Sequence, residues 1–176
     1  MPAHVEAFRL PRYREIPDVG LYLDQTVKYI NRYLEPLGCM EITSSMVSNY
    51  VKKGYISNPV HKQYDADQIA YLIFISVAKS VLTMEHIARL FEMQKQTYTS
   101  EVAYDFFCME LENMLQHAFG LKEQPDVVGT PEEKTDAKAM LRSVIIAVTH
   151  VIYLSSRFDT MIAEENATAT TTPTGA

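Results

Sequence analysis

Residues 42–64 read Ile42-Thr-Ser-Ser-Met-Val-Ser-Asn-Tyr-Val-Lys-Lys-Gly-Tyr-Ile-Ser-Asn-Pro59 and then Val60-His-Lys-Gln-Tyr64. Thr43 is a favourable N-cap residue and Gly54 a favourable C-cap residue, so the pattern predicts a helix over 43–53. At about 100° per residue this helix has one apolar face, formed by Met46, Val47, Tyr50 and Val51. We therefore expect a helix that packs on one side and faces solvent on the other, followed by a compact basic loop.

The polar face of this predicted helix offers side chains that suit a DNA major groove. Asn can bond adenine bidentately, Ser and Thr can meet several base edges, and Lys reaches guanine or phosphate. In helix-turn-helix proteins the N-terminal part of the second helix meets the bases. The candidate DNA-binding residues are Thr43, Ser44, Ser45, Ser48 and Asn49 for bases, Lys52 and Lys53 for phosphates, and His61, Lys62 and Tyr64 for the flanking backbone. The alternative is an ordinary solvated helix face.

Charge is distributed unevenly along the chain. The 176 residues carry a formal net charge of −6, which argues against indiscriminate nucleic-acid binding over the whole surface. Residues 43–64 nevertheless contain Lys52, Lys53 and Lys62 and no Asp or Glu. The composition is therefore compatible with one local basic patch on an acidic protein.

The rest of the chain predicts a mainly α fold. Apolar periodicity and capping signals predict helices over about 18–34, 68–80, a segment starting at Leu82-Thr83, 100–118 and 130–162. Asp65 and Gln68 form a capping box, as do Thr130 and Glu133. Any strands are expected only in the loop after Pro59. We divide the chain into an extended N-terminal arm (1–17), a helix-turn-helix region (18–95), a helical dimerisation or effector region (96–165) and a disordered tail (166–176).

Several motifs resemble the N-terminal domain of the MerR family over about residues 20–95. They are the Thr43 cap, the Gly54-Tyr55-Ile56 step, Lys62 and Tyr64 in a wing, the cap at Asp65 or Asp67, and Leu82-Thr-Met-Glu-His-Ile87. The resemblance implies a winged helix-turn-helix and a transcription regulator that binds double-stranded DNA. Most of the chain, from Pro11 onward, is also similar to a bacterial family known only as a domain of unknown function, which implies no activity.

Other chemistry has little support in the sequence. The five histidines form no ligand pair with Cys, Asp or Glu, and neither a Gly-rich phosphate loop nor a Gly-x-Ser-x-Gly motif occurs. We expect no enzymatic activity, no metal and no cofactor. The aromatic residues Tyr98, Tyr104, Phe106 and Phe107 could line a pocket for a small-molecule effector, with core packing as the alternative.

The apolar run from Ala139 to Leu154 is interrupted by Arg142, Thr149 and His150. We interpret it as a buried or dimer-forming helix rather than a membrane span, although no long heptad-patterned helix is evident. A homodimer would present two recognition helices to DNA. The N-terminus lacks a signal-peptide pattern and the two cysteines, Cys39 and Cys108, have no ligand spacing, so we expect a cytoplasmic protein. The alternative functions are a protein-interaction module on the same scaffold and a helical small-ligand-binding protein.

Overall fold

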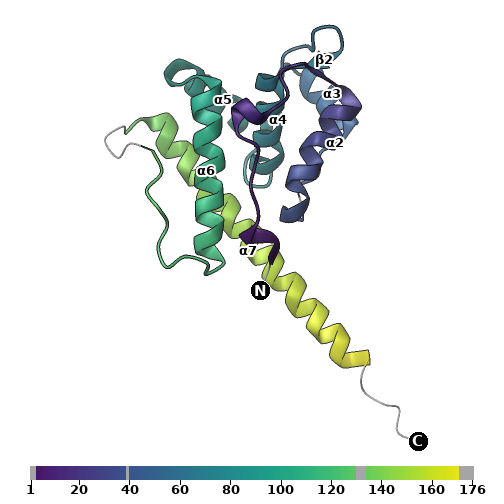
Figure 1. Cartoon of the computed structure of the whole chain (residues 1–176), viewed down its shortest axis with the longest axis vertical. Coiled ribbons are helices and arrows are strands. Elements are labelled where there is room, and N and C mark those ends of the chain that lie inside the picture. Colours follow the sequence, from purple (N-terminus) through teal and green to yellow (C-terminus); the bar gives the residue numbers. More distant parts are fainter. Residues whose placement is uncertain (1–2, 39, 130–133, 171–176) are drawn as a thin grey trace, which may run out of the picture.

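The computed structural model describes residues 3–38, 40–129 and 134–170, and these residues are mainly helical (Figure 1). The helices are α1 (Ala3–Glu6), α2 (Leu23–Leu34), α3 (Ser44–Lys52), α4 (Ala66–Ala78), α5 (Met84–Thr97), α6 (Ser100–Ala118) and α7 (Asp136–Thr170). Two 3-10 turns, η1 (Tyr13–Glu15) and η2 (Glu35–Leu37), and two strands, β1 (Leu21–Tyr22) and β2 (Gln63–Tyr64), complete the described elements. The predicted mainly α fold is confirmed.

Helix α4 lies at the centre of the molecule. Its residues Ile69, Leu72, Ile73 and Ile75 are fully buried, because the helix is apolar on all sides and contacts α2, α5, α6 and α7. The capping box predicted at its start is confirmed: Gln68 N donates to Asp65 Oδ1 at 2.8 Å, and Asp65 N donates to Gln68 Oε1 at 2.8 Å. Local sequence signals therefore placed this central helix correctly.

The two strands form a small antiparallel sheet. Leu21 pairs with Tyr64 and Tyr22 with Gln63. The prediction that strands occur only after Pro59 is therefore wrong for β1, which precedes α2. A two-residue segment carries no periodicity, and only the chain that pairs with it makes it a strand.

The N-terminal arm is part of the body rather than a separate extension. Val5, Phe8, Leu10 and Ile16 are buried in the hydrophobic core, and the arm contains α1 and η1. The described residues of the extended arm predicted over 1–17 thus pack into the core and include two short helical turns. Proline spacing indicated an irregular backbone, but an irregular backbone can still bury apolar side chains.

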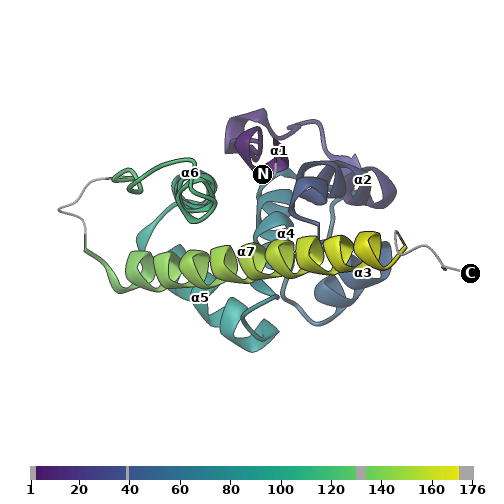
Figure 2. The same ribbon diagram turned by 90° about the horizontal axis from the view of Figure 1, so that it is seen from below.

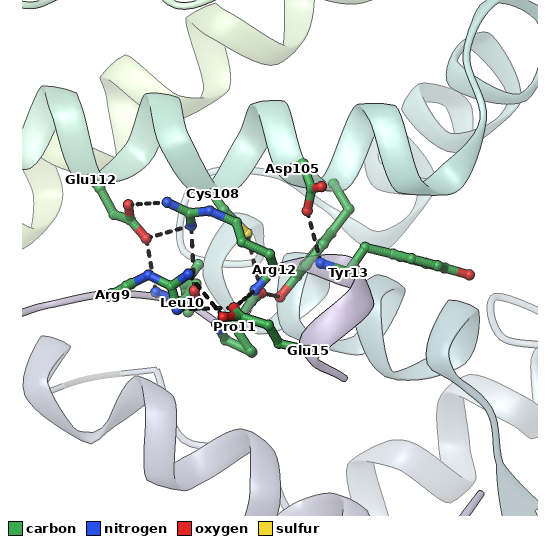
Figure 3. A network of polar contacts seen from close by, with 10 residues as sticks. Arg9, Leu10, Pro11, Arg12, Tyr13, Glu15, Asp105, Cys108 and Glu112 are labelled. Carbon is green, nitrogen blue, oxygen red and sulfur yellow. Dashed lines mark hydrogen bonds and ion pairs between the residues drawn. The ribbon is translucent and has the colours of Figure 1, made fainter. Parts of the chain in front are cut away.

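Figure 3 shows how the arm is bound to α6. The guanidinium of Arg12 donates two hydrogen bonds to the Glu112 carboxylate, at 2.8 and 2.7 Å, and Leu10 N donates to the same carboxylate at 2.9 Å. Tyr13 N donates to Asp105 Oδ1 at 2.8 Å, and Tyr104 OH donates to Pro11 O at 2.8 Å. Hydrogen bonding to Glu112 raises the pKa of Arg12. We call these bonds the arm–α6 contact.

Helix α6 also buries two ionisable side chains. Burial raises the pKa of the Cys108 thiol to about 12. Burial likewise raises the pKa of Glu110, which is fully buried and whose Oε1 lies 3.1 Å from Arg142 Nε on α7. Burial therefore makes ionisation of both side chains less favourable than it is in water. The other cysteine, Cys39, lies outside the described residues.

Helix α7 is longer than expected. The capping box predicted at Thr130 lies outside the described residues; within them Thr135 Oγ1 accepts a bond from Lys138 N at 3.2 Å, just before the first residue of α7. The helix continues past the predicted end at Ile162 to Thr170, where Thr168 Oγ1 donates to Glu165 O at 2.8 Å. Residues 166–170 of the expected disordered tail are therefore helical, and 171–176 lie outside the described residues.

The first part of α7 packs on the body and its last part projects beyond it (Figures 1 and 2). The buried residues on its inner face are Ala137, Val144, Ile145, Val148, Thr149 and Ile152. By length and composition alone, α7 is apolar enough to cross a membrane. Its inner face is already covered by protein, so the exposed apolar side chains lie on its outer face and on its projecting end.

Candidate nucleic-acid interface

Helix α3 has the ends that its sequence predicts. Thr43 Oγ1 accepts a hydrogen bond from Met46 N at 3.2 Å, and the helix begins at Ser44. Gly54 has φ +78°, a left-handed conformation that glycine adopts without a side-chain clash. This turn lets Tyr55 N donate back to Tyr50 O at 2.9 Å, which ends the helix. The predicted helix over 43–53 is confirmed to within one residue at each end.

Neighbouring elements hold α3 from behind. Val47 and Tyr50 are buried in the core. On the connection before α3, the Asn31 side chain bonds both backbone groups of Ile42, at 2.8 and 2.9 Å. On the loop after α3, Gln68 Nε2 donates to Ser57 O at 2.9 Å. Because both flanking connections are tied to the body, the outer face of α3 is presented in a fixed orientation.

That outer face carries small polar and basic side chains. Its exposed residues are Ser45, Ser48, Asn49, Lys52 and Lys53. Within the described part of the chain, none of these five side chains makes a hydrogen bond or an ion pair. Their donors and acceptors are therefore available to an outside partner. We call these five residues the α3 face.

Two predicted base-contacting residues have other roles in the structure. The Thr43 hydroxyl caps α3, and the Ser44 hydroxyl donates to Asp24 Oδ1 at 3.4 Å. Asp24 lies in the first turn of α2 and places a carboxylate beside the start of α3. The set of side chains available for base contacts is thus smaller than the sequence predicted, since Ser44 is half-buried and turned toward this carboxylate.

The basic loop is a tight hairpin with a strained tip. His61 and Lys62 have φ values of 50° and 62°, and Gln63 N donates to Val60 O at 2.9 Å. Two consecutive left-handed residues define a type I′ turn, which favours Asn and Gly and penalises larger side chains. Both side chains are exposed. The chain therefore tolerates backbone strain at the point where it displays an imidazole and an ammonium group.

Tyr64 does not belong to the exposed set. Its side chain is only 4% exposed and lies in the core, opposite Leu21 across the β1–β2 pair. Burial raises the pKa of its hydroxyl. The prediction that Tyr64 grips the DNA backbone is therefore wrong, because strand alternation turns Tyr64 inward.

The four aromatic residues predicted for an effector pocket lie together. Tyr98, Tyr104, Phe106 and Phe107 all line one cavity of about 410 Å³, whose other walls come from α4, α5 and α7. Tyr104 and Phe107 are buried, whereas Tyr98 and Phe106 are half-buried. The cluster thus contributes to the core and to a cavity at once. In the described part of the chain no group of three or more His, Cys, Asp or Glu side chains could hold a metal ion.

These observations define a mainly helical protein in which a capped helix and a short hairpin display a small polar and basic surface. The family described as "Domain of unknown function (DUF1836)" matches residues 11–107, and the chain belongs to this family. The matched range starts in the arm and ends in α6, so it includes the Tyr13–Asp105 and Tyr104–Pro11 bonds of the arm–α6 contact but not Glu112. Neither a search of curated proteins nor a search of solved structures gives a match.

Proposed function

We propose that the protein is a cytoplasmic transcription regulator without enzymatic activity, which binds double-stranded DNA through a MerR-like winged helix-turn-helix. The observation that carries this proposal is the α3 face. Its side chains are exposed, and the helix that bears them is held in a fixed orientation. The α3 face would enter the major groove, with Asn49 and the serines meeting bases and Lys52 meeting phosphate. The hairpin at His61 and Lys62 would act as the wing.

The charge of this surface predicts weak binding by a single copy. Lys52, Lys53 and Lys62 can make about three phosphate contacts, which corresponds to a slope of about −2.7 in log affinity against log salt. Asp24 and the net charge of −6 oppose binding further. Specific binding therefore needs two copies on one DNA site, and we propose that the outer face of α7 forms the homodimer.

Substitutions on the α3 face test the proposal. After selection of a DNA site with the purified protein at two salt concentrations, Asn49→Ala should weaken binding to it by about 1–3 kcal/mol, or about 5- to 150-fold. Lys52→Ala should weaken binding to selected and unrelated DNA sequences alike. It should also reduce the slope of log affinity against log salt by about 1. Lys134→Ala, an exposed lysine at the start of the α7 segment, is the control and should change neither value.

The same titrations distinguish the alternative function. If no sequence is selected and Asn49→Ala and Lys52→Ala bind DNA as well as the parent protein, DNA recognition by the α3 face is wrong. A protein-interaction module would then be favoured, and the observation supporting that reading is the Asp24 carboxylate at the start of α3.

The hairpin tip gives a second test in which two readouts move in opposite directions. The double substitution His61→Asn, Lys62→Gly installs the residues that a type I′ turn prefers. It should raise the free energy of unfolding by about 1 kcal/mol, seen as a melting temperature about 2–4 °C higher. DNA affinity should nevertheless fall, because the ammonium and imidazole groups are lost. A more stable variant with undiminished DNA affinity would show that the tip is not a wing.

A further inference from the structure

The aromatic cavity supports an inference that goes beyond DNA binding. It is lined by α4, α5, α6 and α7 and is partly open to solvent, and its volume of about 410 Å³ lies in the range of small-molecule sites. Its lining is mostly aromatic and aliphatic with a few polar groups, as is typical of such sites. We propose that the cavity binds one neutral, largely aromatic small molecule.

The walls of the cavity favour an aromatic ligand. Tyr71, Phe74, Phe91, Phe106 and Phe107 all line it. The Tyr71 and Phe91 rings meet edge to face with centroids 4.5 Å apart, and Phe74 and Phe107 do so at 5.1 Å. Rings arranged in this way can accept a further ring in offset or edge-to-face contact. Met109, also in the wall and 41% exposed, adds a flexible thioether that adapts to different shapes.

One end of the cavity has a short chain of hydrogen-bonding groups. Tyr71 OH donates to Gln94 Oε1 at 2.8 Å and lies 3.3 Å from Ser100 Oγ. Gln94 Nε2 donates to Tyr98 O at 2.6 Å, which occupies one of its two hydrogens. The second amide hydrogen of Gln94 and a lone pair of Ser100 remain for a ligand. This capacity suits a molecule with one polar group on an apolar body.

Three charged side chains occur in the otherwise mostly apolar lining of the cavity. Two carboxylates, Glu101 and Asp105, and one ammonium, Lys138, line the cavity. Glu101 is held by Arg14 at 2.7 Å, and Asp105 accepts from Tyr13 N at 2.8 Å, so both carboxylates are fixed in place. The Lys138 ammonium lies 5.4 Å from the Phe106 ring centroid. Most of the lining is aromatic or aliphatic, so it would remove water from a charged ligand at a large cost in free energy, and a neutral ligand avoids that cost.

The protein contains no tryptophan, so a single introduced tryptophan can report occupancy. Met109→Trp places the fluorophore in the cavity wall, and Met140→Trp places it on an exposed part of α7 outside the lining. N-phenyl-1-naphthylamine, a neutral aromatic amine, should quench the Met109→Trp emission saturably with one molecule bound per chain. Met140 adjoins Leu141 of the lining, so the Met140→Trp emission should report the same binding event and give the same dissociation constant.

Two comparisons sharpen the assignment. The anionic analogue 8-anilinonaphthalene-1-sulfonate should bind at least about tenfold more weakly than the neutral ligand. Ala103→Phe fills the cavity from α6 and should weaken binding of the neutral ligand about tenfold. Ala139→Phe, exposed on α7, is the matched control, and thermal unfolding checks that each variant is folded. The proposal would be overturned if Met109→Trp showed no saturable quenching or if one ligand bound per two chains. It would also be overturned if folded Ala103→Phe bound the neutral ligand as tightly as the parent protein. No DNA is present, so the result is independent of the proposed DNA binding.

Discussion

Replacing Leu154 and Phe158 together with glutamate should convert the proposed homodimer to a monomer and weaken its binding to a selected DNA site about a hundredfold or more. The affinity loss follows from bivalency: when two linked recognition helices bind one DNA site, the second contact is intramolecular and adds a factor of about 10²–10⁴. This expectation rests on the proposed DNA-binding function and on the shape of α7.

The exposed side of α7 has the spacing of a helix-pairing surface. Leu154 is 51% exposed, Phe158 58% and Met161 47%, and they continue a line that starts at Ala147 and Val151. The intervals along this line are four, three, four and three residues, which is a heptad pattern. The line covers only about two heptads, so the expectation that no long heptad-patterned helix is present is not contradicted.

Two copies of α7 can match each other in an antiparallel pair. With a two-fold axis at Phe158, Leu154 of one copy would lie opposite Ile162 of the other, and Arg157 opposite Asp159. These two pairs are complementary, as an isologous interface requires, whereas Met161 would lie opposite Ser155. The double variant would place four glutamates in this interface, two from each copy. Burying these unpaired charges would cost far more free energy than the pairing of the two helices contributes.

Sedimentation in detergent-free buffer, followed by DNA titration, checks this expectation. The control is Val19→Glu with Val127→Glu, which adds the same two charges at exposed valines outside α7. Full dimerisation of the Leu154/Phe158 variant would refute the α7 interface. A parent protein that partitions into lipid vesicles, while the variant stays in solution, would instead assign the exposed stripe to a membrane, which the length and composition of α7 permit.

Glu112→Ala should lower the free energy of unfolding by about 3 kcal/mol, because it removes the acceptor of the arm–α6 contact. Arg12 and Glu112 side chains are only 24% and 14% exposed, so the guanidinium would be left largely desolvated without its partner. Breaking a fully buried ion pair costs about 3–5 kcal/mol, and partial exposure places this pair at the lower end. The backbone N–H of Leu10, a fully buried residue, would lose its acceptor as well.

Thermal unfolding measures the effect, with an expected decrease of about 6–12 °C in melting temperature. Glu92→Ala is the matched control, since Glu92 also bonds an arginine, Arg89, at 2.9 Å but both side chains are well exposed. An exposed pair contributes about 0–1 kcal/mol, so the control should unfold almost unchanged. Equal losses in the two variants would show that the arm is bound mainly by its apolar residues and not by Glu112.

Local signals determined much of the helical structure. Thr43, Asp65 with Gln68, and Gly54 each act within four residues of their own position, and their predicted roles as caps are confirmed. The apolar periodicity of residues 68–80 likewise identified the central helix. Capping and periodicity depend on atoms that are near in sequence, so a single sequence contains the information needed to place them.

The tertiary structure alone decided which polar side chains are free. Tyr64 looked like a wing residue but pairs inward against Leu21, and Ser44 turns to Asp24, twenty residues earlier. The arm looked separate, yet Arg12 meets Glu112 a hundred residues away. Such contacts depend on which distant segments pack together, and pairing of this kind leaves no period or cap in the sequence. The sequence alone therefore determined the helices and the polar face of α3, whereas long-range packing decided that this face is fixed, that the arm is bound to α6 and that four helices line one cavity.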